Sequence, residues 1–292
     1  MPRTLAAWLP VAALPPAVWW GLPEACPPWV AMWALAFSIY AGCKWLTWVT
    51  ARAPAPLWRH GAYLLGWPGM DAESFLAPKP RGASPPGPWL MAFALAKVLL
   101  GIGLTWIAVH PWTDSFALAR GWTGMIGIVL LLHFGVFDVL SWAWRRLGVD
   151  AKPLMDRPLA SVRLSELWGR RWNTAFRDLT SRFLFRPLAS RLGGPWALML
   201  GFAASGLVHD LVISLPAGGG YGGPTAYFVL QGTGILFERS ALGRKLGLDA
   251  GARGRCFTLS VLILPVLLLF HPPFVRTVIL PMLDVLAEAF CA

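Results

Sequence analysis

The feature that most constrains this chain is a succession of apolar stretches, most of them close to the length that crosses a lipid bilayer. A membrane-spanning helix needs about 20 apolar residues, and backbone groups in hydrocarbon must be paired within the chain, which favours helices. The last two stretches are short and are divided by His271-Pro272-Pro273, where proline limits helix continuity. The Pro- and Gly-rich segment 67–88 is predicted to be an irregular cytoplasmic loop. The candidate spans are 5–21, 28–50, 89–109, 122–144, 196–215, 224–240, 256–271 and 273–290.

The composition supports the same fold class. Hydrophobic residues make up 57% of the 292 residues and charged residues only 13%, whereas a soluble domain usually carries about 25% charged residues. The 18 tryptophans fit the aromatic belts at membrane interfaces. We therefore predict an all-α, polytopic membrane protein of about eight transmembrane helices, folded as a single domain over residues 1–292.

The formal net charge of +11 would suggest a nucleic-acid partner for a soluble chain, but here the basic residues lie between the apolar spans. The loops after the second, fourth and sixth spans are basic, whereas the glycine-rich turn 216–223 has no Lys or Arg. The positive-inside rule explains this alternation and places both termini in the cytoplasm. We expect a multi-pass protein of a bacterial inner (cytoplasmic) membrane, with the lipid bilayer and no nucleic acid as partner; the oligomeric state stays open. The first basic loop carries Arg52, Arg59, Lys79 and Arg81.

The four cysteines, Cys26, Cys43, Cys256 and Cys291, are scattered along the chain and form no CxxC pair. Such spacing argues against a disulfide framework or a zinc site. We therefore expect neither disulfides nor a zinc site.

The stretch 165–186 departs from the plain apolar helices because it is crowded with arginines and aromatic residues. Ser165 is predicted to cap a helix, with Glu166 favourable in its first turn. Apolar residues follow at helical spacing and most arginines fall off that stripe, which predicts an amphipathic or re-entrant cytoplasmic helix. The apolar stripe is Leu164, Trp168, Trp172, Phe176, Leu179 and Phe183.

Two interpretations of this segment stay open. It is either a surface helix held by anionic lipid or a mouth that binds a phosphorylated donor such as coenzyme A, because arginine pairs bidentately with phosphate. In the second case, Arg170 and Arg171 are the donor-binding arginines, beside Trp168 and Trp172. Asn173, at the border of the apolar face, is either an ordinary interfacial residue or a donor of its amide N–H to a developing oxyanion.

A single histidine lies inside the apolar helix 196–215. Ala197, Gly201, Ser205 and His209 recur every four residues and therefore lie on one face. Three small residues that lead to an imidazole are consistent with close helix packing, or with the wall of a channel that has a base at its end. We favour a functional role, because an ionisable residue within a span is a functional candidate by default and histidine suits proton transfer near neutral pH.

Other polar groups within the spans compete with His209. Lys97 and Asp138 lie at similar depth, within about one helical turn, and we predict that they form an ion pair. His133 is the main rival histidine, but bulky residues flank it. Gln231 is expected either to line a polar pocket or to bond to neighbouring helices.

Two motifs point to a known family. ELWGRRWN (166–173), followed by SGLVHD (205–210), resembles the membrane-bound O-acyltransferase (MBOAT) superfamily in its wax-synthase-like branch. That branch typically shows a Trp-Gly-Arg-Arg-Trp stretch with Asn or His next, and downstream a Ser-Gly-x-x-His-acid element. The resemblance is strongest over 160–283, the motif-bearing catalytic region, and departs from the branch at Asp210, where glutamate is common. Three further segments resemble the same branch and occur in the same order along the chain: GWPGMDAESFL (66–76), YFVLQG (227–232) and HPPFVRTVILPML (271–283).

The resemblance implies a helical bundle around a tunnel through the membrane, with acyl-CoA as co-substrate and with no metal and no resident cofactor. It further implies that His209 is the general base and Asn173 its partner on the cytoplasmic side. The expected reaction is transfer of a fatty acyl group from acyl-CoA to the hydroxyl of a long-chain alcohol or related lipid. The residues expected to bind the substrates are Trp168, Arg170, Arg171, Trp172, Ser205 and Gln231.

Two alternatives stay open at this point. One is acylation of a polar or exported acceptor such as a glycan. The other is a non-enzymatic membrane transporter, in which Lys97, His133, Asp138 and His209 form a proton path. The chain shows polar residues in several spans but no internal repeat of the kind many transporters have.

Overall fold

The computed structural model describes residues 2–78, 84–110 and 112–291, without the side chains of 2–5, 114, 290 and 291. Lys79, Arg81 and the side chain of Cys291 therefore lie outside the described residues. All regular structure within those ranges is helical, which confirms the all-α prediction. The chain divides into two compact units, Met1–Leu154 with Ile279–Ala292, and Met155–Val278. The single-domain interpretation of 1–292 stays a prediction.

Five helical stretches are long and apolar enough to cross a membrane, counted over the described ranges. The other three predicted spans also lie in helices: α1 (Pro2–Gly21), α13 (Gly223–Arg239) and the stretch 272–291. The chain is thus a multi-pass integral membrane protein, while a total of eight spans stays a prediction. The five stretches are Pro28–Val49, Pro88–Val109, Ala117–Arg146, Gly194–Ala217 and Gly251–Leu269.

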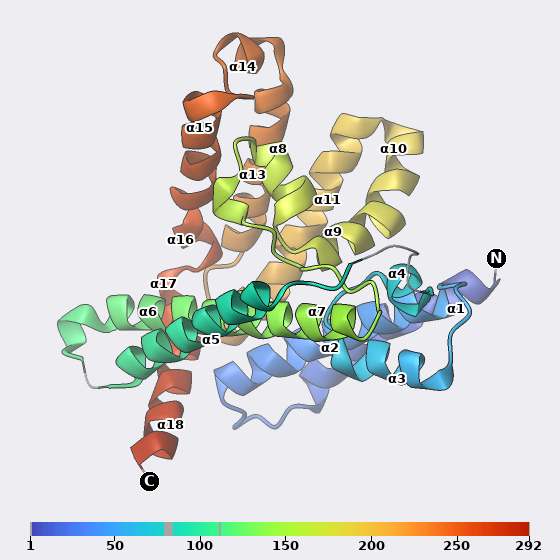
Figure 1. Ribbon diagram of the computed structural model, residues 1–292. Helices are drawn as coiled ribbons and strands as arrows, with labels where there is room; N and C mark the ends of the chain where they lie inside the picture. The colour runs from blue at the N-terminus through green and yellow to red at the C-terminus, as the bar shows by residue number, and fades with distance from the viewer. Residues whose placement is uncertain (1, 79–83, 111, 292) are drawn as a thin grey trace. The chain divides into compact units, whose positions relative to one another are not determined.

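In unit 1, the residues 1–154 and 279–292, helices that follow each other in the chain pack along one another. α1 packs on α2, and α5 packs on the continuous stretch formed by α6, η2 and α7 (Figure 1). Its helices are α1, α2 (Pro28–Val49), α3 (Leu57–Gly66), α4 (Ala72–Leu76), α5 (Pro88–Val109), η1 (Asp114–Phe116), α6 (Ala117–Val129), the π-helical η2 (Leu130–Val136), α7 (Phe137–Arg146) and α18 (Leu280–Cys291).

Two local predictions in unit 1 have different outcomes. The Lys97 ammonium of α5 donates to the Asp138 carboxylate of α7, which confirms the predicted ion pair; the two side chains are 17% and 19% exposed. The segment 67–88 is not wholly irregular, because α4 forms within it. Asp71 caps this short helix by accepting a hydrogen bond from Ser74 N at 3.0 Å.

In unit 2, the residues 155–278, α11 and α13 pack along one another and α10 packs on α11 (Figure 1). This pairing positions the predicted catalytic histidine, which ends α11. The helices are η3 (Pro158–Ala160), α8 (Leu164–Glu166), η4 (Leu167–Arg171), α9 (Thr174–Thr180), η5 (Ser181–Phe185), α10 (Arg186–Leu192), α11 (Gly194–His209), η6 (Asp210–Ser214), α12 (Leu215–Ala217), α13, α14 (Ala241–Lys245), α15 (Gly251–Ile263), α16 (Val266–Leu269), α17 (Pro272–Phe274) and η7 (Val275–Ile279). All of the η elements except η3 are π-helical here.

The basic stretch that was predicted as one amphipathic helix is divided into two pieces. The first piece, α8 with η4, ends before Trp172, which is extended, and α9 starts after Asn173, which is left-handed (φ 41°, ψ 62°). The expected cap by Ser165 is also wrong. The carboxylate of Glu238 in α13 accepts hydrogen bonds from Leu164 N and Ser165 Oγ, each at 2.5 Å. A partner 74 residues away thus supplies the cap, because packing of α13 brings a carboxylate to these orphan donors.

Candidate active site

His209 is the last residue of α11 and lies directly before the π-helical turn η6. Its Nδ1 atom is 2.7 Å from the carbonyl oxygen of Ser205, one helical turn earlier. Because a carbonyl oxygen can only accept a hydrogen bond, Nδ1 carries the proton of the neutral imidazole and Nε2 keeps its lone pair. Isolated π-helical turns are frequent at functional sites. The local structure therefore equips His209 to accept a proton at Nε2.

A cluster of aromatic rings from three segments extends away from this histidine. The ring of Phe228 in α13 lies 4.4 Å from the His209 imidazole, centre to centre. Trp168 of η4 contacts both Phe228 (5.6 Å) and Phe202 of α11 (5.7 Å). Trp172 lies 6.3 Å from Trp168. The structure thus joins the predicted residues Trp168 and Trp172 to His209 through Phe228.

Gln231 holds Trp168 rather than facing an open space. Its side chain is 0% exposed. The Oε1 atom accepts a hydrogen bond from Trp168 Nε1 at 3.3 Å, and Nε2 donates to the Val261 carbonyl of α15 at 2.8 Å. Gln231 was expected either to line a polar pocket or to bond to neighbouring helices, and its contacts agree with the second role. Any role of Gln231 in substrate binding would therefore act through Trp168.

The small residues of α11 contribute to helix packing. On the face that leads to His209, Ala197 is fully buried, and Gly201 faces Thr180 of α9 at ordinary contact distance (3.7 Å from an added Cβ). On another face, a Cβ at Gly206 would lie 2.5 Å from Thr225 Cα of α13. Glycine is therefore required where α11 and α13 meet, one turn before the histidine.

Asn173 is positioned by local contacts. Its Oδ1 atom caps α9 by accepting from Phe176 N at 3.5 Å, and its backbone N–H donates to the Met155 sulfur at 3.2 Å. Asparagine tolerates the left-handed backbone conformation that this position adopts. Among the hydrogen bonds of the described residues, none joins Asn173 to His209, so its role as catalytic partner stays a prediction.

The two predicted donor-binding arginines differ in their surroundings. Nε and one terminal nitrogen of Arg171 both lie 2.8 Å from Oε1 of Glu166, whereas Arg170 is exposed. Glu166 also accepts from Val162 N at 3.1 Å. This backbone N–H is the largest cause that lowers the pKa of Glu166, and Arg171 adds to it. Arg171 therefore stabilises the motif segment, and Arg170 is the arginine open to a ligand.

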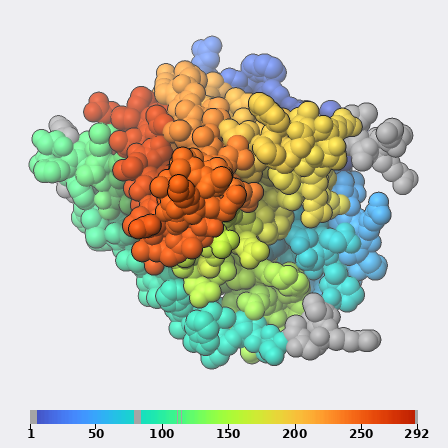
Figure 2. All heavy atoms as spheres, turned by 90° about the horizontal axis from the view of Figure 1, so that it is seen from above, coloured from blue at the N-terminus to red at the C-terminus, as the bar shows by residue number. Residues whose placement is uncertain are grey.

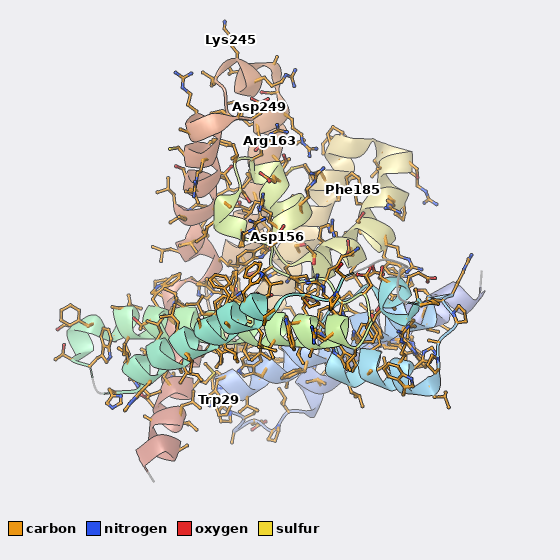
Figure 3. All side chains as sticks on the ribbon, in the orientation of Figure 1. Trp29, Asp156, Arg163, Phe185, Lys245 and Asp249 are labelled. Atoms are coloured by element: carbon orange, nitrogen blue, oxygen red, sulfur yellow. The ribbon has the colours of Figure 1, made fainter. Side chains whose placement is uncertain are left out.

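One end of unit 2 is basic and is held together by arginine-to-backbone contacts. The atoms of α14 and the turn after it lie nearest the viewer within this unit in Figure 2, and Lys245, Asp249 and Arg163 are labelled at the same end in Figure 3. Arg163 Nε donates to the Asp249 carbonyl at 2.6 Å, and Arg255 donates to the Leu159 carbonyl at 3.1 Å. These bonds connect the loop before α8 to the start of α15.

The rival histidine, His133, lies in unit 1 within the π-helical η2. Its ring contacts Phe137 at 5.2 Å, centre to centre. Its Nδ1 atom is buried and has no hydrogen-bond partner within the described ranges. Unlike that of His209, its tautomer is therefore not fixed by a carbonyl oxygen.

Several residues of this site escaped the sequence reasoning. Phe228 and His271 lie in the stretches YFVLQG and HPPFVRTVILPML, so those motifs marked the right segments without indicating the contacts. Periodicity alone places Asp210 away from His209 and gives no partner for it, yet four hydrogen bonds end on its carboxylate. Glu238 lies within a predicted span and no local pattern indicates its role, whereas the structure shows it as the cap of α8.

Comparison with known proteins agrees with the motif reading. Residues 151–230 match the Membrane bound O-acyl transferase family. The Arabidopsis thaliana protein named probable long-chain-alcohol O-fatty-acyltransferase 9 is 28% identical over 204 residues, which cover 64% of this chain and 58% of that protein. The long-chain-alcohol O-fatty-acyltransferase of Simmondsia chinensis is 30% identical over 74 residues, 22% of this chain and 21% of that protein. The chain thus spans less than two thirds of these relatives, and the predicted family resemblance is confirmed.

Proposed function

We propose that the chain is an enzyme that transfers a fatty acyl group from an acyl-CoA to a hydroxyl acceptor, because residues 151–230 match the Membrane bound O-acyl transferase family. The acceptor class that we propose is a long-chain alcohol or a related lipid. The names of the similar plant proteins support this class, since they are long-chain-alcohol O-fatty-acyltransferases.

The observation that carries the proposal is the hydrogen bond from His209 Nδ1 to the Ser205 carbonyl. It leaves Nε2 as the basic atom of the ring. In the proposed reaction, Nε2 takes the proton of the acceptor hydroxyl as its oxygen attacks the thioester carbonyl. The carbon–sulfur bond then breaks, the coenzyme A sulfur takes that proton from Nε2, and an ester is formed.

Asn173 is proposed to stabilise the oxyanion of this reaction. Its Oδ1 atom is used by the N–H of Phe176, which leaves the amide N–H₂ group as the donor side of the side chain. A preorganised amide donor at a developing oxyanion is worth about 10²–10³ in rate.

The donor is proposed to bind with its phosphates at the arginine-containing segment 166–173. Arg170 is exposed and is the arginine proposed to meet these phosphates, and Trp168 and Trp172 form an apolar wall that leads through Phe228 to His209. Aromatic surroundings exclude water, which favours transfer to an alcohol over hydrolysis. From the loop charges we also propose a bacterial inner membrane with both termini and these basic loops in the cytoplasm.

The test is esterification by purified protein in detergent or liposomes. Wild type and His209→Ala are given radiolabelled long-chain acyl-CoA with a fatty alcohol, a sterol or a sugar. We expect a labelled wax-type ester with wild type and its loss in the variant. Full activity of His209→Ala would reject the mechanism. Product with the sugar alone would establish the polar-acceptor alternative, and no product with any acceptor would contradict the enzymatic proposal for these substrates.

A further inference from the structure

The carboxylate of Asp210, the residue after His209, is fully occupied by hydrogen-bond donors. Oδ1 accepts from Ser214 Oγ and from Gly222 N, each at 2.8 Å. Oδ2 accepts from Thr225 N at 3.0 Å and from Thr225 Oγ1. An ionised carboxylate has about four lone-pair sites, so this group is saturated and has no free site for substrate.

Most of these donors belong to the beginning of α13. The helix starts at Gly223, and its N-cap residue, Gly222, is left-handed (φ 78°) and has no capping side chain. The first N–H groups of a helix lack partners within the helix, and a negative charge there is favourable. Asp210 therefore caps α13 from outside, across the turn that joins α12 to α13.

A directed chain of hydrogen bonds connects this cap to His271. The N–H of Phe274 donates to His271 Nδ1 at 3.1 Å, so Nδ1 is unprotonated and Nε2 carries the ring proton. Nε2 lies 3.2 Å from Ser214 Oγ and donates to it, which leaves the Ser214 hydroxyl proton for Asp210. The Gly220 carbonyl is a second, more distant acceptor for the Ser214 hydroxyl, at 3.4 Å against 2.8 Å for Asp210. His271 is 6% exposed.

The glycine-rich turn is shaped around the same imidazole. Gly220 has φ 73°, and a Cβ on it would lie 2.3 Å from the His271 ring. Glycine is thus required at Gly220 both by its backbone conformation and by the space. The turn 218–222, the cap of α13 and His271 therefore pack together as one cluster, the cap cluster.

The cap cluster determines which side chain packs against His209. Thr225, whose N–H and hydroxyl both bind Asp210, is one turn before Phe228 on α13. Phe228 packs on the His209 imidazole at 4.4 Å. Since Asp210 also follows His209 directly in the chain, the same carboxylate fixes the histidine and the ring that packs on it.

We propose that Asp210, Ser214 and His271 are positioning residues that hold the His209 imidazole against Phe228 by capping α13. None of them exchanges a proton with substrate. The proposal rests on the proposed function for its kinetic consequence only, because the cap itself is measurable without any substrate.

The substrate-free experiment is hydrogen–deuterium exchange of the full chain in detergent micelles, followed by mass spectrometry of peptides that cover 218–228. In Asp210→Asn one face of the side chain becomes a donor and cannot accept from Gly222 or Thr225, so exchange there should be about tenfold faster or more. The imidazole ¹⁵N chemical shifts of His209, measured on protein with labelled histidine, should also change in Asp210→Asn. Asp284→Asn, an exposed carboxylate variant in unit 1, should leave both readouts unchanged.

A second variant removes one donor only. Thr225→Val keeps its backbone N–H and loses its hydroxyl; the matched control is Thr233→Val on the same helix, whose exposed hydroxyl donates only to its own Val229 carbonyl. We expect Thr225→Val and His271→Gln to lower kcat for acyl transfer in the same direction as Asp210→Asn, which should lose about tenfold or more. KM for acyl-CoA should stay within about twofold because ground-state binding is untouched, and Thr233→Val should behave as wild type.

The outcomes separate the two proposals. Faster exchange with wild-type kcat in Asp210→Asn would overturn the positioning role and leave a purely structural cap. Unchanged exchange and unchanged histidine spectra would overturn the cap itself. A wild-type chain that transfers no acyl group would contradict the proposed function, while the exchange and histidine spectra would still decide the cap and its hold on His209.

Discussion

The Nδ1 atom of His209 and the carbonyl oxygen of Ser205 are 2.7 Å apart across one turn of α11. The same local contact occurs on His110, whose Nδ1 lies 2.7 Å from the Trp106 carbonyl at the end of α5. His110 is exposed, whereas His209 is packed against Phe228. The two histidines thus share the same tautomer but differ in exposure, so comparing them distinguishes the effect of the tautomer from the effect of the surroundings.

This pair gives a matched test of the base. We expect His209→Gln to lower kcat for acyl transfer by about 10²–10⁴, the usual contribution of a general base. His110→Gln loses the same type of hydrogen bond and should keep wild-type activity. His133→Gln is the third variant, because His133 is the rival histidine. Equal losses in the His133 and His209 variants would contradict the assignment of a single base.

Asn173 allows its backbone role to be separated from its chemical role. Asn173→Gly keeps the left-handed conformation without strain, whereas Asn173→Ala adds about 1–2 kcal/mol of strain to the same loss of the amide. If the amide stabilises the oxyanion, both variants should lose about 10²–10³ in kcat. Both also lose the cap of α9, and the alanine variant should unfold more easily than the glycine variant because of the added strain. Kinetics and thermal unfolding in detergent measure the two effects. Wild-type activity of Asn173→Gly would show that the position matters for its conformation alone.

Glu238 should be needed for the stability of unit 2. Its buried carboxylate accepts from Leu164 N and Ser165 Oγ. Glu238→Gln replaces one acceptor oxygen by a donor and should reduce the free energy of unfolding by about 1–3 kcal/mol. Thermal unfolding followed by circular dichroism measures this, with Glu24→Gln, an exposed carboxylate variant of unit 1, as control. A variant as stable as wild type would mean that this cap adds nothing to stability.

Glu166 should make stability depend on acid pH. Its pKa is lowered, first by the N–H of Val162 and further by Arg171. A carboxylate whose folded pKa is depressed adds to stability above its unfolded pKa of about 4.3, and that contribution is lost as the pH falls through the folded pKa. The difference in unfolding free energy between wild type and Glu166→Gln should therefore be constant near neutral pH and shrink below about pH 4. Denaturant titrations at a series of pH values measure it, and a difference that grows on acidification would refute the assignment.

The Lys97–Asp138 pair should show coupling in a double-mutant cycle. Each side chain is less than one fifth exposed, and removing one partner leaves the other charge poorly solvated. We expect Lys97→Met and Asp138→Leu each to destabilise the protein, and the double variant to be more stable than the sum of the two predicts, by about 0.5–3 kcal/mol. Unfolding midpoints of the four proteins give this coupling energy. Strictly additive losses would show that the pair contributes no interaction of its own.

Local sequence features predicted the helices well and their interruptions less well. The predicted spans coincide with helices to within a few residues, since long apolar runs in a membrane have few alternatives to a helix. The ion pair of Lys97 with Asp138 followed from helical rise alone. The stretch around Trp172 and Asn173 was predicted as continuous helix because its apolar residues keep helical spacing. The left-handed Asn173 that ends this continuity does not alter that spacing, so periodicity could not reveal it.

What the sequence by itself determined is the membrane class, the helical fold and the resemblance to a family, and it predicted His209 as the leading candidate base. Each depends on residues that are close together in the chain: an apolar run, a motif, or an imidazole one turn after Ser205. Only the tertiary structure decided which side chains surround that base and which carboxylates cap which helices. Glu238 caps α8, Asp210 caps α13, and Phe228 packs on the histidine. Their partners are assembled by helix packing, and no local pattern specifies which distant donor a buried carboxylate will reach.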